Sequence, residues 1–233
     1  LINNQQKAIS SIDIKAGSFA EVELPFTIYE TGHQKGLLQI ADYPVTYDDK
    51  FYFSFEVMNS VSVLCINGDT ENVYLNALFK QDSAVKLTNA NEKMLDYSKL
   101  SNFNLIVLNE LSNLSSGLVQ EIKKFVLNGG SILLLPAENA DLQSYNNFAS
   151  SLSFPSYLSI DTSDTKVDQI SEESVLFRDV FETAPGQKAI NNNTDLPIVL
   201  KHFPIVSGTG TMSLPLIKMI NGRTFLSQTI TGN

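Results

Sequence analysis

Polar side chains with chemical potential gather at four places where an apolar run of the chain ends. The four stretches are Asn67–Asp69, Thr88–Asn91, Asn109–Ser112 and Pro136–Asn139. If each run is a strand of one parallel sheet, these ends meet in a crevice of the kind that binds ligands in open α/β sheets. Amide and carboxylate groups suit hydroxyl-rich ligands, so we predict ligand contacts from six residues: Asn67, Asp69, Asn109, Glu110, Glu138 and Asn139.

Nucleophilic catalysis would need a Ser or Cys on a tight strand-to-helix turn, with a base nearby. The fourth strand end is the place for it, and Pro136-Ala137 stands there. The sequence holds no G-x-S-x-G motif. We therefore predict no catalytic residue and favour a protein that is not an enzyme. One alternative stays open, a hydrolase with Glu110 and Glu138 as acid and base, which requires carboxylates within about 10 Å of each other.

Metal and thiol chemistry have little support in the sequence. The single cysteine, Cys65, lies inside an apolar run and is expected to be a small buried hydrophobe. His33 and His202 are far apart and lack zinc-site spacing. No cofactor is predicted, because the P-loop and G-x-G-x-x-G patterns are absent. Three loop acids could bind calcium but are more typical of solvated turns: Asp42, Asp48 and Asp49.

Composition limits the class of partner. The chain has 233 residues, of which 43% are hydrophobic, and a formal net charge of -9. An acidic chain repels phosphate backbones, so no nucleic-acid partner is expected. No apolar run reaches the ~18 residues that span a bilayer. The chain begins without Met inside a strand-like pattern, which favours a fragment of a longer protein.

From Val61 onward, apolar runs alternate with helical patterns. The expected strands cover 61–67, 84–88, 103–108 and 131–136, and the expected helices cover 72–80, a segment capped by Ser115 or Ser116 and ended by Gly129-Gly130, and 141–152. This alternation predicts a parallel sheet with right-handed crossovers, a three-layer flavodoxin-like α/β domain spanning Val61 to Val206. A C-terminal β-hairpin is expected over 214–230, with a type I′ turn at Asn221-Gly222.

The first part of the chain is β-rich. Short alternating runs predict strands at Ser11–Ile14, Phe19–Phe26, Gly36–Asp42 and Lys50–Val57. This is too few strands for a complete immunoglobulin-like sandwich, so we expect its missing strands to precede Leu1. The predicted division is a partial immunoglobulin-like β-domain over residues 1–59 and an α/β domain over residues 60–233.

Two sets of segments resemble known families. The first comprises Glu30–Gly36, Ile40–Pro44 and Tyr47–Phe53, and the second comprises Asn104–Leu108, Leu118–Phe125 and Asn128–Leu134. The first set resembles the extracytoplasmic β-domain of BatA-like, aerotolerance-related bacterial membrane proteins, which carry an N-terminal double-transmembrane segment. The second set is similar to the class I glutamine-amidotransferase-like fold, in which the strand after Gly-Gly leads into a catalytic Cys.

The resemblance implies a glutamine-amidotransferase-like domain over residues 60–233 without the family's activity. Pro136-Ala137 replaces the Cys elbow, and no His-x-Glu follows. It also implies flanking transmembrane segments, a location on the periplasmic side of the inner membrane, and protein partners at the membrane. We therefore expect a non-catalytic interaction module in envelope or stress-related assembly. The alternative is a small-molecule or carbohydrate-binding domain that uses the Asn-rich crevice.

Overall fold

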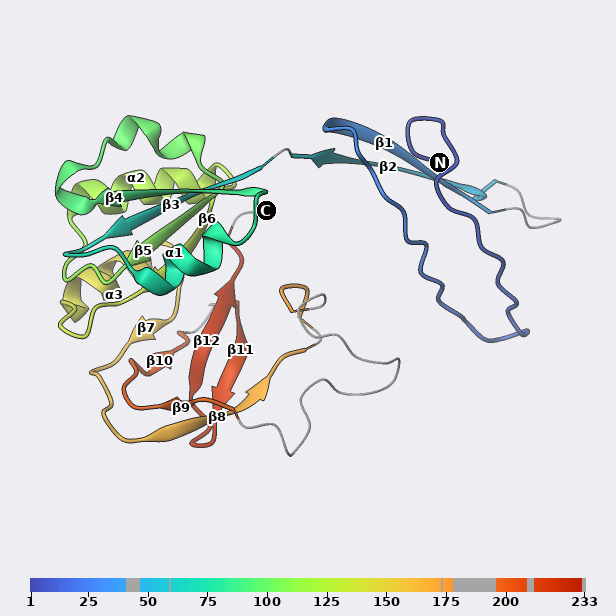
Figure 1. Ribbon diagram of the computed structural model, residues 1–233. Coiled ribbons are helices and arrows are strands. Elements are labelled where there is room, and N and C mark those ends of the chain that lie inside the picture. Colours follow the sequence, from blue (N-terminus) through green and yellow to red (C-terminus); the bar gives the residue numbers. More distant parts are fainter. Residues whose placement is uncertain (41–46, 59, 173, 178–195, 209–211, 232–233) are drawn as a thin grey trace. The chain divides into compact units, whose positions relative to one another are not determined.

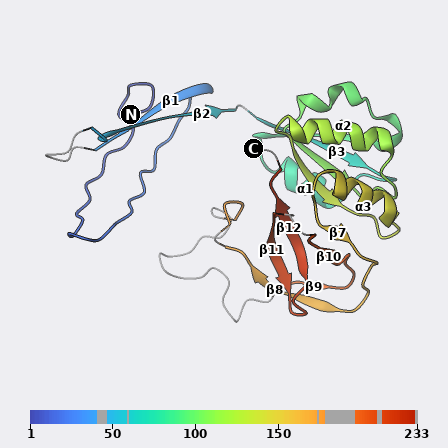
Figure 2. The same ribbon diagram turned by 180° about the vertical axis from the view of Figure 1, so that it is seen from behind.

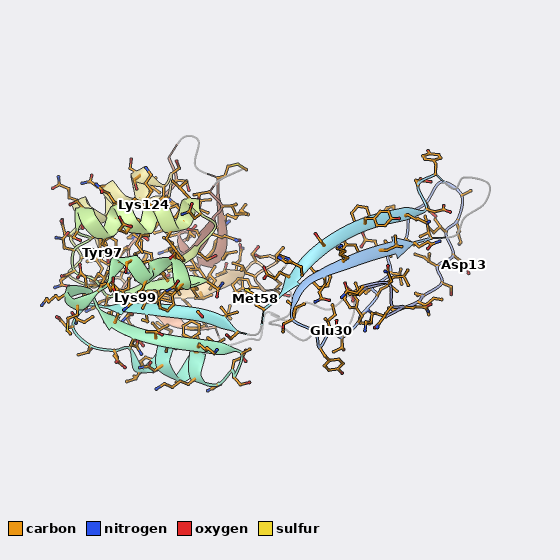
Figure 3. All side chains as sticks on the ribbon, turned by 90° about the horizontal axis from the view of Figure 1, so that it is seen from above. Asp13, Glu30, Met58, Tyr97, Lys99 and Lys124 are labelled. Carbon is orange, nitrogen blue, oxygen red and sulfur yellow. The ribbon has the colours of Figure 1, made fainter. Side chains whose placement is uncertain are left out.

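The structure, a computed structural model, describes residues 1–40, 47–58, 60–172, 174–177, 196–208 and 212–231 (Figure 1). The chain divides into two compact units, Leu1–Val61 and Ser62–Asn233. Met58 lies near the end of the first unit, a few residues before this boundary (Figure 3). Within the described residues, no helix has both the length and the apolar character needed to cross a membrane.

The first unit is built on one antiparallel hairpin. Strand β1 (Gly32–Gln39) pairs with β2 (Lys50–Val57), and Gly36 stands opposite Phe53. The Phe53 ring lies over Gly36, where a Cβ atom would be only 2.2 Å from the ring. The first residues of the chain run along the other edge of β1, where the Leu37 N–H donates to the Leu1 carbonyl at 2.9 Å. The pairing partner of β1 on that side is thus the N-terminus itself.

Two of the predicted strands in this unit are wrong. Ser11–Ile14 and Phe19–Phe26 contain no strand, and the Phe19 side chain is 87% exposed. Alternating apolar residues give a segment one apolar face, but a strand forms only where a neighbour accepts its backbone hydrogen bonds. The structure gives neither segment such a neighbour within the described residues. The prediction for Lys50–Val57 is confirmed, while the strand expected from Gly36 begins earlier, at Gly32.

The second unit contains the predicted α/β arrangement. A four-stranded sheet has the order β4-β3-β5-β6. Its members are β3 (Val61–Asn67), β4 (Val85–Asn91), β5 (Leu105–Asn109) and β6 (Ser131–Leu135). Strands β3, β5 and β6 run parallel, and Asn67 stands in register with Asn109. Strands β3 and β5 are mostly apolar and mostly buried, as expected for the central strands of the sheet.

Three helices follow the strands as predicted, and each begins at a polar cap. They are α1 (Val73–Lys80), capped by Asn72, α2 (Ser116–Leu127), capped by Ser115, and α3 (Leu142–Ser151), capped by Asp141. Helices α2 and α3 (Figure 2) contribute buried side chains to one core with the sheet, whereas α1 contributes none. Two short 3₁₀ helices that the sequence pattern did not predict, η1 (Glu92–Met94) and η2 (Tyr97–Asn102), lie between β4 and β5.

The parallel part of the unit ends with α3, well before the predicted limit at Val206. Four later strands form an antiparallel sheet of order β12-β11-β8-β9. They are β8 (Thr165–Ile170), β9 (Ile198–Val199), β11 (Ser213–Met219) and β12 (Thr224–Thr229). Strands β7 (Ser156–Tyr157) and β10 (Ile205–Val206) pair separately. The sequence pattern did not predict β8, because this strand is mostly polar and Val167 is its one buried residue.

The C-terminal hairpin is confirmed, but its type I′ turn is wrong. A type I′ turn needs positive φ at both central residues. Only Gly222 has it, at +76°, and its N–H donates to the Met219 carbonyl at 2.8 Å. The loop therefore has three residues, 220–222, one more than predicted, with Gly222 as its last residue.

Candidate functional site

The parallel register brings two predicted site residues together. Asn67 and Asn109 end the neighbouring strands β3 and β5, and both are buried. The Asn109 Nδ2 donates to the Asn67 Oδ1 at 2.9 Å. A buried amide without a partner is costly, so this contact stabilises both strand ends.

Three further asparagines extend this contact into a chain of side-chain amides. Asn72 Nδ2 donates to Asn109 Oδ1 at 3.3 Å. Asn67 Nδ2 donates to Asn89 Oδ1 at 3.0 Å, and Asn89 Nδ2 donates to Asn76 Oδ1 at 2.8 Å. We call Asn67, Asn72, Asn76, Asn89 and Asn109 the amide network. It joins β3, β4, β5 and the start of α1. Asn72, Asn76 and Asn89 are not among the predicted site residues: Asn72 caps α1, Asn76 lies within α1, and Asn89 lies in β4.

Asn67 and Asn72 of the amide network also bond to protein groups outside the network. Asn67 also receives the Cys65 thiol on Oδ1 at 3.3 Å, so both ends of this amide are engaged by protein groups. The Asn72 Oδ1 accepts the N–H groups of Tyr74 and Leu75, the first-turn donors of α1. The arrangement therefore fixes the strand ends and the helix start relative to each other.

Asp69 and Glu110 lie on the exposed side of the same strand ends. Both side chains are exposed, and Glu110 adopts the left-handed backbone conformation, with φ of +52°. Gly68 donates its N–H to the Asn109 carbonyl at 3.1 Å, and a Cβ at this glycine would be 2.4 Å from the Glu110 carbonyl oxygen. The two backbones approach closely here, and a non-glycine residue with positive φ is a feature found at functional sites.

The remaining two predicted residues belong to the loop after β6. Glu138 and Asn139 are both exposed. The Glu138 carboxylate pairs with the Lys201 ammonium at 2.6 Å, with side-chain exposures of 68% and 50%. Such a solvated pair contributes little to stability. The acid and base roles predicted for Glu110 and Glu138 remain a prediction.

Pro136 and Ala137 follow directly after β6. Ala137 is buried, and its carbonyl accepts the Ala140 N–H at 3.0 Å. A serine nearby, Ser144, donates its hydroxyl to the Asp141 carbonyl at 2.9 Å and accepts the Leu114 N–H at 3.2 Å. This hydroxyl connects the start of α3 to the loop before α2.

Cys65 is buried, as predicted. Burial raises the pKa of its thiol from 9.0 to about 11, against a smaller lowering by the hydrogen bond to Asn67. The thiol therefore stays protonated at neutral pH, and a protonated thiol is a poor nucleophile.

The residues considered for metal binding do not converge in the described part of the chain. There, no group of three or more His, Cys, Asp or Glu side chains could hold a metal ion. Asp42 lies outside the described residues, and Asp48 is exposed. His202 is buried, and burial lowers its pKa against the opposing effect of Asp161.

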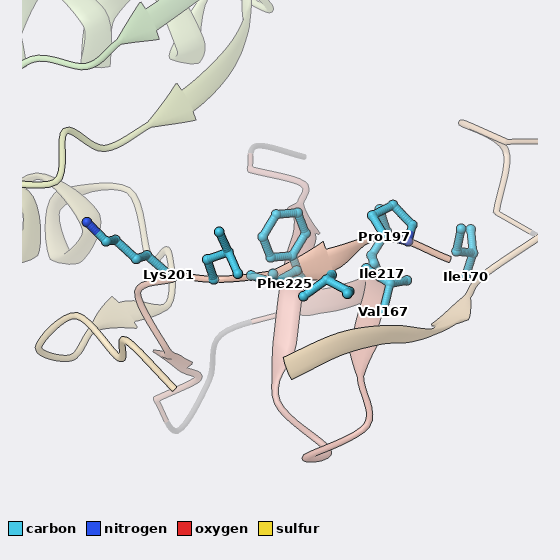
Figure 4. Close-up of a pocket in the computed structure, with 9 residues that line it drawn as sticks. Val167, Ile170, Pro197, Lys201, Ile217 and Phe225 are labelled. Atoms are coloured by element: carbon cyan, nitrogen blue, oxygen red, sulfur yellow. The ribbon is translucent and has the colours of Figure 1, made fainter. Parts of the chain in front are cut away.

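A pocket that the sequence pattern did not predict lies on the antiparallel sheet. It has a volume of about 510 Å³ and an almost wholly apolar lining. Figure 4 shows Val167, Ile217 and Phe225 in this lining, with Lys201 extending away from them. The apolar residues that β8 and β11 contribute to it, Val167, Ile170 and Ile217, form no alternating pattern, so the sequence gives no signal for the pocket.

These features define an α/β protein whose parallel-strand ends are joined by buried amides. Among solved structures, the chain is similar to a ThuA-like protein from Bacteroides uniformis, with 13% identity over 82% of this chain and 80% of that one and a TM-score of 0.47. No protein-family model matches the chain, and no curated protein matches it.

Proposed function

We propose that this chain is a non-catalytic interaction module, and that the aromatic row on β2 is its contact surface. Three phenylalanines form the row. The Phe51 and Phe53 rings stack at a centroid distance of 6.3 Å, and Phe53 and Phe55 stack at 6.1 Å. Phe51 is 64% exposed and Phe53 37% exposed. Contiguous exposed apolar surface rich in aromatic rings is typical of protein–protein contact sites.

The wider biological setting of this module is part of the same proposal. The segments that resemble BatA-like proteins support a membrane-anchored bacterial protein with this chain on the periplasmic side. The segments that resemble class I amidotransferases support flavodoxin-like layering of the α/β part, without a nucleophile at Pro136-Ala137. Envelope or stress-related assembly is the role that such a module would serve.

Site-specific photo-cross-linking tests the contact surface. A photoreactive phenylalanine analogue at Phe51 is expected to form a defined protein adduct in bacteria that produce the protein. The matched control is the same analogue at Tyr74, which is 82% exposed on α1. Equal or absent adducts at the two positions would rule out the β2 row as the contact surface.

A second function rests on the exposed groups above the amide network. Asp69 and Glu110 present carboxylates beside the left-handed Glu110 backbone, where a hydroxyl-rich small molecule or carbohydrate could bind. A thermal-shift screen with sugars and nucleotides tests it. A shift that Glu110→Gln abolishes supports this function, and no shift with any ligand removes it.

A further inference from the structure

The outer edge of β2 is open to another strand. In the described part of the chain, β2 pairs with β1 alone. The Leu37 N–H and carbonyl bond to the N-terminal residue, so the odd-numbered residues of β1 direct their backbone groups away from β2. By the alternation of an antiparallel pair, Phe51, Phe53 and Phe55 bond to β1, while Tyr52 and Ser54 direct their backbone groups outward.

The sequence of this edge is complementary to itself. If two copies of β2 run antiparallel about Phe53, Lys50 of each copy stands opposite Glu56 of the other. Tyr52 then stands opposite Ser54, and these are the residues with outward backbone groups. Opposite charges directly across two strands are favourable, and like charges are not. Shifting the register by two residues in either direction removes both Lys–Glu pairs, so the charges select a single alignment.

The same alignment brings aromatic side chains together. Phe53 meets its symmetry mate in a pair without backbone hydrogen bonds, where side chains come closest. Phe51 and Phe55 lie opposite each other on the same face, and cross-strand aromatic pairs stabilise a sheet. Two hairpins would thus form one four-stranded sheet with a continuous row of six phenylalanines, and each open edge would be covered.

We propose that two copies of this chain associate through β2 in an antiparallel, two-fold arrangement centred on Phe53. The inference rests on the proposed function and names the partner for the β2 surface: a second copy of this chain. A two-fold contact of this kind is isologous, because each copy contributes the same strand.

Reversing the charges of Lys50 and Glu56, singly and together, tests the proposal. Analytical ultracentrifugation of the purified chain between about 5 and 200 µM is expected to show a monomer–dimer equilibrium. Lys50→Glu and Glu56→Lys each place like charges opposite each other, so each should weaken dimerisation at least about tenfold. The double variant K50E/E56K restores both pairs and should restore the dimer. Glu21→Lys, an exposed change of the same type in the same unit, should leave it intact.

A proline substitution in β2 tests whether the backbone of its outer edge forms the contact. Ser54→Pro removes an outward N–H, and it should abolish the dimer while far-ultraviolet circular dichroism confirms that the second unit stays folded. A wild-type monomer at all concentrations, or a dimer that neither the single charge variants nor Ser54→Pro weaken, would overturn the self-association. In that event, a cross-link from Phe51 to a different protein would still support the interaction module, and the two proposals are therefore separable.

Discussion

At the scale of single residues, the buried amides are the most informative feature of the second unit. Asn109 Nδ2 donates to Asn67 Oδ1 at 2.9 Å, beside the weaker Cys65 thiol donor at 3.3 Å. Asn109→Asp replaces this donor with a carboxylate oxygen inside a buried site. We expect the free energy of unfolding to fall by about 3 kcal/mol at pH 7, as measured by urea denaturation. Asn139→Asp, the same change at an exposed position, should alter it by less than about 0.5 kcal/mol.

The raised pKa of Cys65 predicts that the stability of the folded chain falls at alkaline pH. Its pKa is 9.0 in the unfolded chain and about 11 in the folded one, because burial disfavours the thiolate. Between these values the unfolded state binds fewer protons than the folded state, so stability is complete below pH 9 and is lost as pH rises toward 11. Cys65→Ala should lose stability less steeply over this range in urea titrations at successive pH values. Equal slopes for wild type and variant would contradict the assignment.

At the scale of elements, the ends of β3 and β5 depend on a glycine. A Cβ at Gly68 would stand 2.4 Å from the Glu110 carbonyl oxygen, which is backbone and cannot rotate away. Gly68→Ala should therefore destabilise the chain by at least about 2 kcal/mol. Gly117→Ala on α2, where the nearest atom is 3.9 Å away, should be neutral or stabilising by up to about 1 kcal/mol. Thermal unfolding of both variants measures the contrast, and equal losses would contradict it.

Elements with a local signal were predictable from the sequence, and those that need a distant partner were not. Helix α2 has both its cap, Ser115, and its terminating Gly129, at φ of +92°, within a few residues of its apolar stripe. The segment Phe19–Phe26 has equally clear alternation but no strand, because strand formation depends on a neighbour that local sequence does not specify. The pairing of the short β9 with β8 joins residues about thirty positions apart, so local sequence does not specify it.

The residues of the candidate site also divide into those with a local sequence signal and those that depend on a distant partner. Asn67 and Asn109 were predictable together, because parallel strands place their ends at one edge. Asn76 was not, because its contact with Asn89 depends on how α1 turns after its cap. The left-handed Glu110 backbone has no sequence signature at all, since this conformation is uncommon for any residue with a side chain.

At the scale of the whole molecule, two compact units imply two separable unfolding events. Leu1–Val61 contains the β1–β2 hairpin, whereas Ser62–Asn233 contains the main core, centred on side chains such as Ile106, Leu118 and Phe148. A hairpin has few buried contacts and should open at a lower free energy than a packed α/β core. Amide hydrogen exchange should therefore be faster in β2 than in β5.

Variants in each unit should test this separation directly. Gly36→Ala forces the Phe53 ring to move, since the new Cβ would be 2.2 Å from it, and it should accelerate amide exchange in β1 and β2 alone. Asn109→Asp should accelerate exchange in β3, β5 and α1, which the amide network joins, and leave the hairpin unchanged. Hydrogen exchange read by mass spectrometry resolves both sets of peptides. If either variant accelerates exchange in the two units together, the molecule unfolds as one cooperative body.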